Sequence, residues 1–208
     1  MTDSGACAAV ILAGGKSSRM GRAKADLPFG TGTMLDRIIA EMQRTFEDAV
    51  VAVAEPRRYQ WESDRVRVIV DEESYQGPVR ALERALREIR CGRAFVCSCD
   101  VPLVSGALAR RLCESMDESD DALIPMVAGK LQMLHGVYRK RCAEILATMH
   151  RNSENRLHRI VDFAKVRILS DKEIRALGPD SDLRSFFNVN TPEDYRRALD
   201  LLSDKNKM

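Results

Sequence analysis

The sequence predicts an α/β protein in which helices cover both faces of a mostly parallel sheet, giving three layers. Short apolar runs alternate with amphipathic stretches of helical periodicity over most of the chain. That alternation is typical of parallel strands joined by crossover helices. The chain has 208 residues, of which 45% are hydrophobic, so it can bury one sizeable core.

Six apolar runs are expected to form strands, because each is short and bounded by turn residues or charges. The first run, from Ala6 to Ala13, is too short to cross a bilayer, and no basic stretch precedes it. It therefore predicts a buried strand. The expected strands cover residues 8–12, 50–54, 66–70, 94–98, 122–126 and 131–138.

Capping residues mark the helices between and after these strands. Thr33 is followed three residues later by Asp36, and Thr191 is followed by Pro192 and Asp194. Both patterns are typical of a capping box, and proline suits the first helical position. Beyond about residue 139 the pattern changes to charged helices. The expected helices follow Thr33, Gly77-Pro78, Ser105 and Thr191.

Charge and hydropathy indicate a soluble, cytoplasmic protein. The 33 basic and 31 acidic residues leave a net charge of +2, so no global field favours nucleic acid or an anionic membrane as a partner. No basic-aromatic stripe typical of nucleic-acid binding is found either. Any anion recognition must therefore be local.

The six cysteines are expected to be reduced thiols, because the chain is large and carries no secretion signal. Cys97 and Cys99 form a C-x-C pair on one face of a strand, and packing in the core is favoured over metal binding. The three histidines do not have the spacing of a zinc site.

Polar and glycine residues lie where the expected strands end. Gly14 and Gly15 follow the first strand, Asp71 follows the third and Asp100 follows the fourth. Ligands of parallel α/β sheets bind beyond the carboxyl ends of the strands. The three segments are therefore expected to converge on one site.

The glycine loop favours phosphate binding. Gly14 and Gly15 allow close backbone approach and positive φ, and successive N–H groups in such a loop can cradle phosphate oxygens. Arg19 and Lys24 add cationic donors. The P-loop pattern fails because Met20 stands where its second glycine is required, and the dinucleotide fingerprint G-x-G-x-x-G is absent as well.

Five segments together resemble a known family. The runs LAGGKSSRMGRAK, VDEESYQGP, FVCSCDVPLV, LQMLHGVYRK and FFNVNTPEDY are similar, in this order, to elements of nucleotidyltransferases with a pyrophosphorylase-like fold. Within them, the resemblance is to the molybdenum cofactor guanylyltransferases. It implies a nucleotide-diphospho-sugar transferase-like fold with a Rossmann-like N-terminal half. It also implies one domain over residues 1–208, with a nucleotide-binding half at about 1–120 and an acceptor-binding half at about 121–208.

The resemblance also assigns roles to individual residues. The implied catalytic residues are Lys24, Arg19 and Asp100, and Asp100 is the implied magnesium ligand. Fixed cations suit this role because nucleotidyl transfer concentrates charge on phosphate. The implied nucleotide-binding residues are Leu12, Ala13, Gly14, Gly15, Lys24, Asp71 and Asp100. The implied acceptor-binding residues are Gly77, Pro78, Asn188 and Asn190.

The implied reaction is magnesium-dependent transfer of GMP from GTP to molybdopterin, with release of pyrophosphate. A molybdoenzyme or its chaperone is the implied recipient of the product. Glu55 and Arg80 depart from the family pattern, so alternatives stay open. These are a cytidylyltransferase acting on molybdopterin, a sugar-phosphate nucleotidyltransferase, or a non-catalytic carrier of the molybdenum cofactor.

Overall fold

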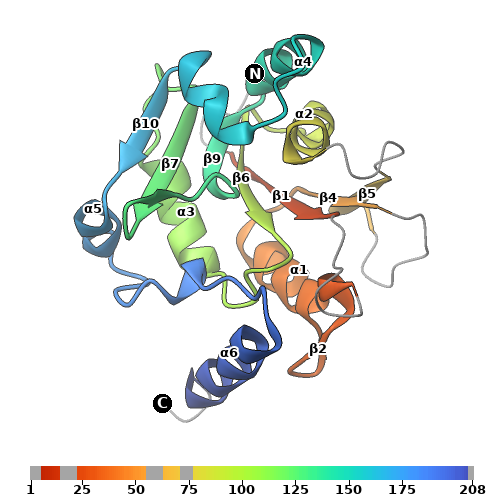
Figure 1. Cartoon of the computed structure of the whole chain (residues 1–208), viewed down its shortest axis with the longest axis vertical. Helices are drawn as coiled ribbons and strands as arrows, with labels where there is room; N and C mark the ends of the chain where they lie inside the picture. The colour runs from red at the N-terminus through yellow and green to blue at the C-terminus, as the bar shows by residue number, and fades with distance from the viewer. Residues whose placement is uncertain (1–5, 15–22, 55–62, 71–76, 206–208) are drawn as a thin grey trace.

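The computed structural model describes residues 6–14, 23–54, 63–70 and 77–205. Its described residues form a mixed sheet with strand order β10-β7-β9-β6-β1-β4-β5, flanked by helices on both faces (Figure 1). A small hairpin stands apart from this sheet. The sheet strands are β1 (Ala8–Ala13), β4 (Ala49–Val53), β5 (Val66–Val70), β6 (Arg93–Ser98), β7 (Ala122–Val127), β8 (Lys130–Leu131), β9 (His135–Arg139) and β10 (Val166–Leu169), and the hairpin strands are β2 (Pro28–Phe29) and β3 (Gly32–Thr33).

The N-terminal half of the sheet is parallel, as the sequence predicts. Strand β1 pairs in parallel with β4 and β6, and β4 pairs in parallel with β5. The carboxyl ends of these strands therefore meet at one edge of the sheet. In the second half of the sheet, β9 runs antiparallel to both β6 and β7, and β8 runs antiparallel to β7.

Two expectations for the second half of the sheet are wrong. The expected strand over residues 131–138 is divided into β8 and β9, because the backbone N–H of His135 bonds back to the carbonyl of Gln132 in a turn. Strand β10 lies where only helices are expected, and it pairs in parallel with β7 at the edge of the sheet. At four residues, β10 is too short for its periodicity to stand out.

The helices divide between the two faces of the sheet. Apolar residues of α1 and α3 join one large core, and those of α2 and α4 join the other. The capping box of α1 forms as predicted, with Thr33 Oγ1 accepting from the Asp36 N–H at 3.1 Å. The helix bounds are α1 (Met34–Thr45), α2 (Pro78–Glu88), α3 (Gly106–Glu114), α4 (Cys142–Arg151), α5 (Asp171–Ala176) and α6 (Pro192–Lys205), with 3-10 turns η1 (Lys24–Asp26), η2 (Leu157–Asp162) and η3 (Arg184–Phe186).

A third, smaller core joins α6 to the hairpin that follows η1. Leu27 and Phe29 from the hairpin pack with Val189 and Ala198 from the C-terminal segment. The Tyr195 hydroxyl donates to the Pro28 carbonyl and so adds a polar contact between the same two segments. Two parts of the chain more than 150 residues apart are thereby held together.

The expectation that all cysteines are reduced is wrong for one pair. Cys7, just before β1, forms a disulfide with Cys113 in α3, at a Cα–Cα distance of 6.7 Å. Cys97 is a buried free thiol, and Cys99 packs against the same core. Both therefore fit the expected packing role.

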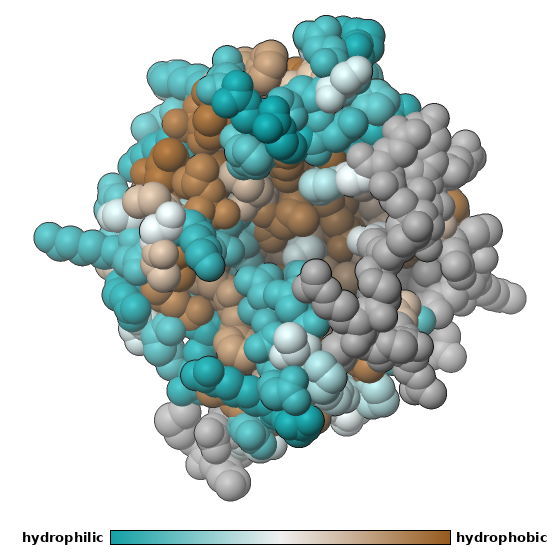
Figure 2. All heavy atoms as spheres, in the orientation of Figure 1, coloured by the Kyte–Doolittle hydropathy of each residue, from teal (hydrophilic) through white to brown (hydrophobic). Residues whose placement is uncertain are grey.

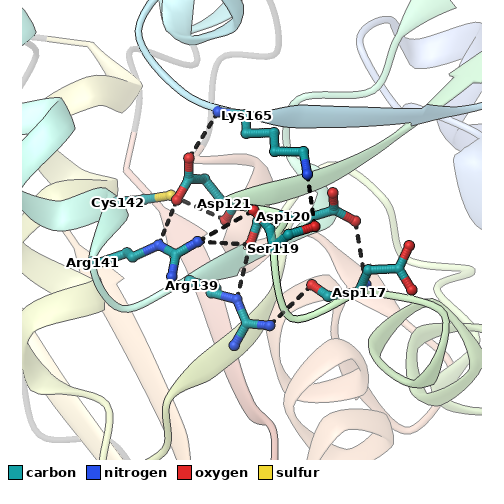
Figure 3. A network of polar contacts seen from close by, with 8 residues as sticks. All are labelled: Asp117, Ser119, Asp120, Asp121, Arg139, Arg141, Cys142 and Lys165. Carbon is teal, nitrogen blue, oxygen red and sulfur yellow. Dashed lines mark hydrogen bonds and ion pairs between the residues drawn. The ribbon is translucent and has the colours of Figure 1, made fainter.

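A polar network closes the end of the sheet opposite the carboxyl ends of its parallel strands (Figure 3). Asp121, which immediately precedes β7, accepts from Arg141 Nε at 2.5 Å and from the Lys165 N–H at 2.7 Å. Arg139 at the end of β9 donates to the Asp120 carbonyl at 2.8 Å. The network fastens the starts of β7 and β10 to the end of β9.

None of the helices in the described ranges is both long enough and apolar enough to cross a membrane.

Candidate functional site

The site is built at the carboxyl edge of the sheet, where β1 and β6 end side by side. Leu12 is in register with Ser98, and the Cys99 N–H donates to the Leu12 carbonyl at 3.0 Å. The end of β6 therefore continues alongside β1, which brings Gly14 and Asp100 to the same edge. In Figure 2 the face in view is hollowed near its middle, with apolar side chains at the bottom and hydrophilic ones around them.

Gly14 lies just beyond the end of β1 and close to Ala54. A methyl group at this position would have the nearest described atoms, those of Ala54, 4.0 Å away. Gly14 is not among the described residues with positive φ, so it does not use the left-handed freedom that the sequence suggested. Its contribution is the absent side chain, which leaves the backbone open to an incoming group.

Asp100 lies two residues beyond the end of β6 and is held from two sides. The Ser98 hydroxyl donates to its Oδ1, and its backbone carbonyl accepts from the Val189 N–H at 2.8 Å. The second contact fixes the C-terminal segment against the end of β6. The sequence prediction gave Ser98 no role. Residues two apart on an extended chain point to the same side, so the hydroxyl of Ser98 could have been expected to contact the Asp100 carboxylate.

Lys24 meets the C-terminal segment directly. Its Nζ donates to Asn190 Oδ1 at 2.7 Å, a contact between residues 166 positions apart. Lys24 begins η1, and the small core beneath the hairpin supports this turn. Two residues that the resemblance assigns to different halves of the site therefore touch.

The electrostatics around Cys99 show how closely these groups are gathered. Burial raises the pKa of the Cys99 thiol to about 12. The Asp100 carboxylate also raises this pKa, whereas the Lys24 cation opposes the shift. Cys99 is therefore a neutral thiol near both charged groups of the site.

The start of α6 fixes the position of Asn190. Asp194 Oδ2 accepts from the backbone N–H groups of Asn190 at 3.0 Å and Thr191 at 2.9 Å, and Thr191 Oγ1 accepts from the Asp194 N–H at 3.1 Å. This is the predicted capping box, extended by one residue toward Asn190. Asn188 differs, because its side-chain amide donates to the Phe186 carbonyl of its own segment at 3.0 Å.

Gly77 and Pro78 lie at a different helix. Gly77 is the N-cap of α2 with φ of 89°, a conformation that favours glycine, and Pro78 occupies the first turn. A side chain at Gly77 would approach the Asn155 carbonyl oxygen at 3.8 Å. In Figure 1, α2 lies in the upper part of the view and α6 at the bottom, and the implied acceptor-binding residues belong to the segments that begin these two helices.

Arg80 does not carry an uncompensated charge into the site. Its Nη1 donates to Glu83 Oε2 at 2.6 Å, and Arg87 Nε donates to the other oxygen of the same carboxylate at 2.6 Å. Glu83 is only 4% exposed, whereas the two arginine side chains that neutralise it reach toward solvent. The departure from the family pattern at Arg80 is therefore matched by an acid within the same helix.

Four sequence positions lie outside the described residues: Gly15, Arg19, Asp71 and Glu55. Their predicted roles stay predictions.

The donor set fits a hard divalent cation that takes most of its ligands from elsewhere. The described residues contain no group of three or more His, Cys, Asp or Glu side chains able to hold a metal. Asp100 offers its carboxylate at the carboxyl edge of the sheet. Magnesium is commonly held by one or two carboxylates together with substrate phosphates and water, so the Asp100 carboxylate is compatible with it.

A buried histidine beside the C-terminal segment was missed by the sequence prediction. His135 is 2% exposed, and its ring centroid lies 4.3 Å from that of Phe186. Within the described part of the chain neither ring nitrogen has a hydrogen-bond partner. Burial lowers the pKa of His135 to about 3, so the ring is neutral and packs as an aromatic residue.

Comparison with known proteins shows the family to which the chain belongs. Residues 9–168 match the family model described as MobA-like NTP transferase domain. A relative from Carboxydothermus hydrogenoformans, named probable molybdenum cofactor guanylyltransferase, is 33% identical over 94% of this chain and 96% of its own.

Solved structures share the fold. Molybdopterin-guanine dinucleotide biosynthesis protein A from Archaeoglobus fulgidus superposes with a TM-score of 0.80 at 22% identity, over 95% of this chain and 99% of that one. A Mycobacterium tuberculosis protein solved with manganese superposes with a TM-score of 0.65 at 20% identity, over 94% and 98% of the two chains. On the family match and the identity to the curated relative, the chain belongs to the MobA-like NTP transferases.

Proposed function

We propose that this chain transfers GMP from GTP to molybdopterin and releases pyrophosphate. The observation that carries the proposal is the contact between Lys24 and Asn190 at 2.7 Å, beside Asp100 at the carboxyl edge of the sheet. It supports the proposal because a lysine, the segment that bears Asp100 and the C-terminal segment meet there, and these are the groups to which phosphate and metal binding are assigned in the proposal. Family membership and the curated relative named as a guanylyltransferase supply the donor and the acceptor.

The residues of the site act by positioning and by neutralising charge. The strand end from Leu12 to Gly14 receives the triphosphate. Lys24 has three N–H donors, so it keeps its contact with Asn190 while it donates to a phosphate oxygen. Arg19 adds a second cation. A terminal phosphate oxygen of molybdopterin attacks the α-phosphorus of GTP in line, and the bond to the leaving pyrophosphate breaks. The attacking phosphate is already ionised, so no strong general base is required.

Asp100 holds a divalent cation, for which magnesium is proposed. When bound, the cation neutralises charge on the phosphates as it develops. Ser98 orients the carboxylate through the contact to Oδ1, which leaves the second oxygen for a ligand. The presence of manganese with one solved structure of this fold is consistent with a divalent site.

The remaining assignments follow from the same proposal. Asp71 and Gly15 contact the nucleotide, and Gly77, Pro78, Asn188 and Asn190 face molybdopterin. Residues 1–120 form the nucleotide-binding half and residues 121–208 the acceptor-binding half of one domain. The proposed setting is the cytoplasm, with a molybdoenzyme or its chaperone as recipient and with neither nucleic acid nor membrane as partner.

The test is a pyrophosphate-release assay with magnesium, molybdopterin and each of the four nucleoside triphosphates in turn. Release with GTP alone supports guanylyl transfer. Release that depends on CTP or UTP assigns the chain to the cytidylyl or sugar-phosphate alternatives. Molybdopterin binding with no release from any triphosphate supports the carrier alternative.

Two variants test the assigned residues. Lys24→Ala and Asp100→Ala are each expected to abolish turnover while the circular dichroism spectrum stays that of the folded chain. Lys130→Ala removes an exposed lysine of β8 and serves as the matched control with unchanged turnover. Full activity in either site variant contradicts its assignment.

A further inference from the structure

The link between α6 and the catalytic lysine suggests a role for a residue that otherwise looks like an ordinary helix cap. In a capping box the acid at the third helical position bonds the N–H of the N-cap residue. Asp194 does this to Thr191 at 2.9 Å. The same oxygen also accepts from the N–H of Asn190 at 3.0 Å, one residue earlier than the box requires.

The extra bond fixes the backbone that carries the partner of Lys24. Asn190 is exposed, so burial does not hold its side chain in place. Its Oδ1 nevertheless accepts from Lys24 Nζ at 2.7 Å. The carboxylate of Asp194, the backbone and side chain of Asn190 and the ammonium of Lys24 thus form one continuous chain of contacts.

The charges favour this arrangement. The Asn190 N–H lowers the pKa of Asp194 most strongly, the Thr191 contacts lower it further, and the Lys24 cation adds to the shift. Asp194 is therefore ionised and attracts the ammonium group as well as the amide groups. Tyr195 follows Asp194 in α6, and its hydroxyl donates to the carbonyl of Pro28, just after η1. This contact holds α6 close to η1, the turn that begins with Lys24.

We infer that Asp194 is a positioning residue for the proposed transfer reaction and acts through Asn190 to place Lys24 at the phosphate site. This inference rests on the proposed function for its catalytic consequence, but not for the contact chain itself. A purely structural cap would stabilise α6 and leave Lys24 unaffected.

The chain offers a matched control for helix capping. Ser170 and Glu173 form a second capping box on α5, with Glu173 Oε2 accepting from the Ser170 N–H at 2.8 Å. Glu173 lies on a different helix from the one that contacts Lys24. Glu173→Ala therefore removes a cap of the same kind without touching the Asp194–Asn190–Lys24 chain.

The first experiment measures Lys24 directly and requires no turnover. Acetylation by an amine-reactive ester is followed by peptide mass spectrometry, with Lys130 in the same molecule as the internal standard. In Asp194→Ala the labelling rate of Lys24 relative to Lys130 is expected to rise about threefold or more, and in Glu173→Ala it is expected to stay unchanged. An unchanged ratio in Asp194→Ala overturns the inference whether or not the chain is a guanylyltransferase.

The second experiment measures the catalytic consequence by pyrophosphate release with magnesium, GTP and molybdopterin. Asp194→Ala is expected to lower kcat/KM for GTP about tenfold, and Glu173→Ala less than twofold. In an Asn190→Ala background, Asp194→Ala is expected to have less than a twofold further effect, because both act through one chain. If the losses in kcat/KM from Asp194→Ala and Asn190→Ala multiply in the double variant, the inference is overturned. If the unaltered protein releases no pyrophosphate, the proposed function is overturned, and the labelling experiment alone decides whether Asp194 positions Lys24.

Discussion

Replacing Gly136 in β9 by alanine tests the packing that sets β9 between its two neighbours. A β-carbon at Gly136 would stand 2.7 Å from the Leu123 carbonyl oxygen and 2.8 Å from Ile124 Cδ1. An ordinary carbon–oxygen contact is about 3.3 Å or longer, so the methyl group is roughly 0.6 Å too close. The oxygen belongs to the backbone of β7, which is paired on both sides and cannot easily move.

The expected cost follows from two opposing effects. Overpacking of a well-packed core costs about 1–3 kcal/mol. The gain of Ala over Gly in the unfolded state returns about 0.4–1 kcal/mol. The net expectation for Gly136→Ala is a loss of about 1–2 kcal/mol in the free energy of unfolding, or a Tm lower by roughly 2–8 °C for a chain of this size.

Urea unfolding followed by circular dichroism measures this difference. Gly92→Ala is the matched control, because no atom of the described residues lies within 4 Å of its added methyl group and its φ is not positive. Its free energy of unfolding is expected to be unchanged or up to about 1 kcal/mol higher. Equal values for the two variants, within about 0.5 kcal/mol, would refute the argument from close approach.

Two further predictions concern stability. Partial burial acts to raise the pKa of Asp121, but hydrogen bonds from the Lys165 N–H and Arg141 outweigh this effect and lower the pKa (Figure 3). The ionised Asp121 carboxylate therefore contributes its full stability above the unfolded pKa of about 3.9. This stability is lost as pH falls through the lower folded value. Asp121→Asn should cost about 1–2 kcal/mol at pH 7 and flatten the acid limb of a urea-denaturation pH series, and an unchanged limb would contradict this. The Cys7–Cys113 disulfide spans 106 residues, so reductant should lower the free energy of unfolding by about 2–4 kcal/mol. Thiol titration of the unfolded, unreduced chain should find four thiols, and six would disprove the disulfide.

Local signals in the sequence were read correctly because each depends on a few neighbouring residues. Thr33 with Asp36, and Thr191 with Asp194, form the predicted boxes, since capping needs only a hydroxyl and an acid three positions apart. The parallel order of β1, β4 and β5 followed from the alternation of apolar runs and helices. With it came the prediction that the segments after β1 and β6 share one edge.

Longer-range features were missed where the deciding partner is distant in sequence. The disulfide of Cys7 depends on where α3 packs, and general rules about secretion favoured free thiols instead. The short edge strand β10 depends on the exposed edge of β7 for its hydrogen bonds. Neither leaves a periodic signal in the residues around it.

The sequence alone determined the class of sheet, and it predicted the edge at which ligands are expected to bind and the types of residue that lie there. These features can be predicted from the 2-residue repeat of strands, the 3.6-residue repeat of helices and the chemistry of single side chains, because each depends on only a few neighbouring positions. The tertiary structure alone decided that Asn190 contacts Lys24 and that Asp194 holds Asn190 in place. A contact across 166 residues is selected by the packing of α6 on the hairpin after η1, and that packing depends on the whole fold.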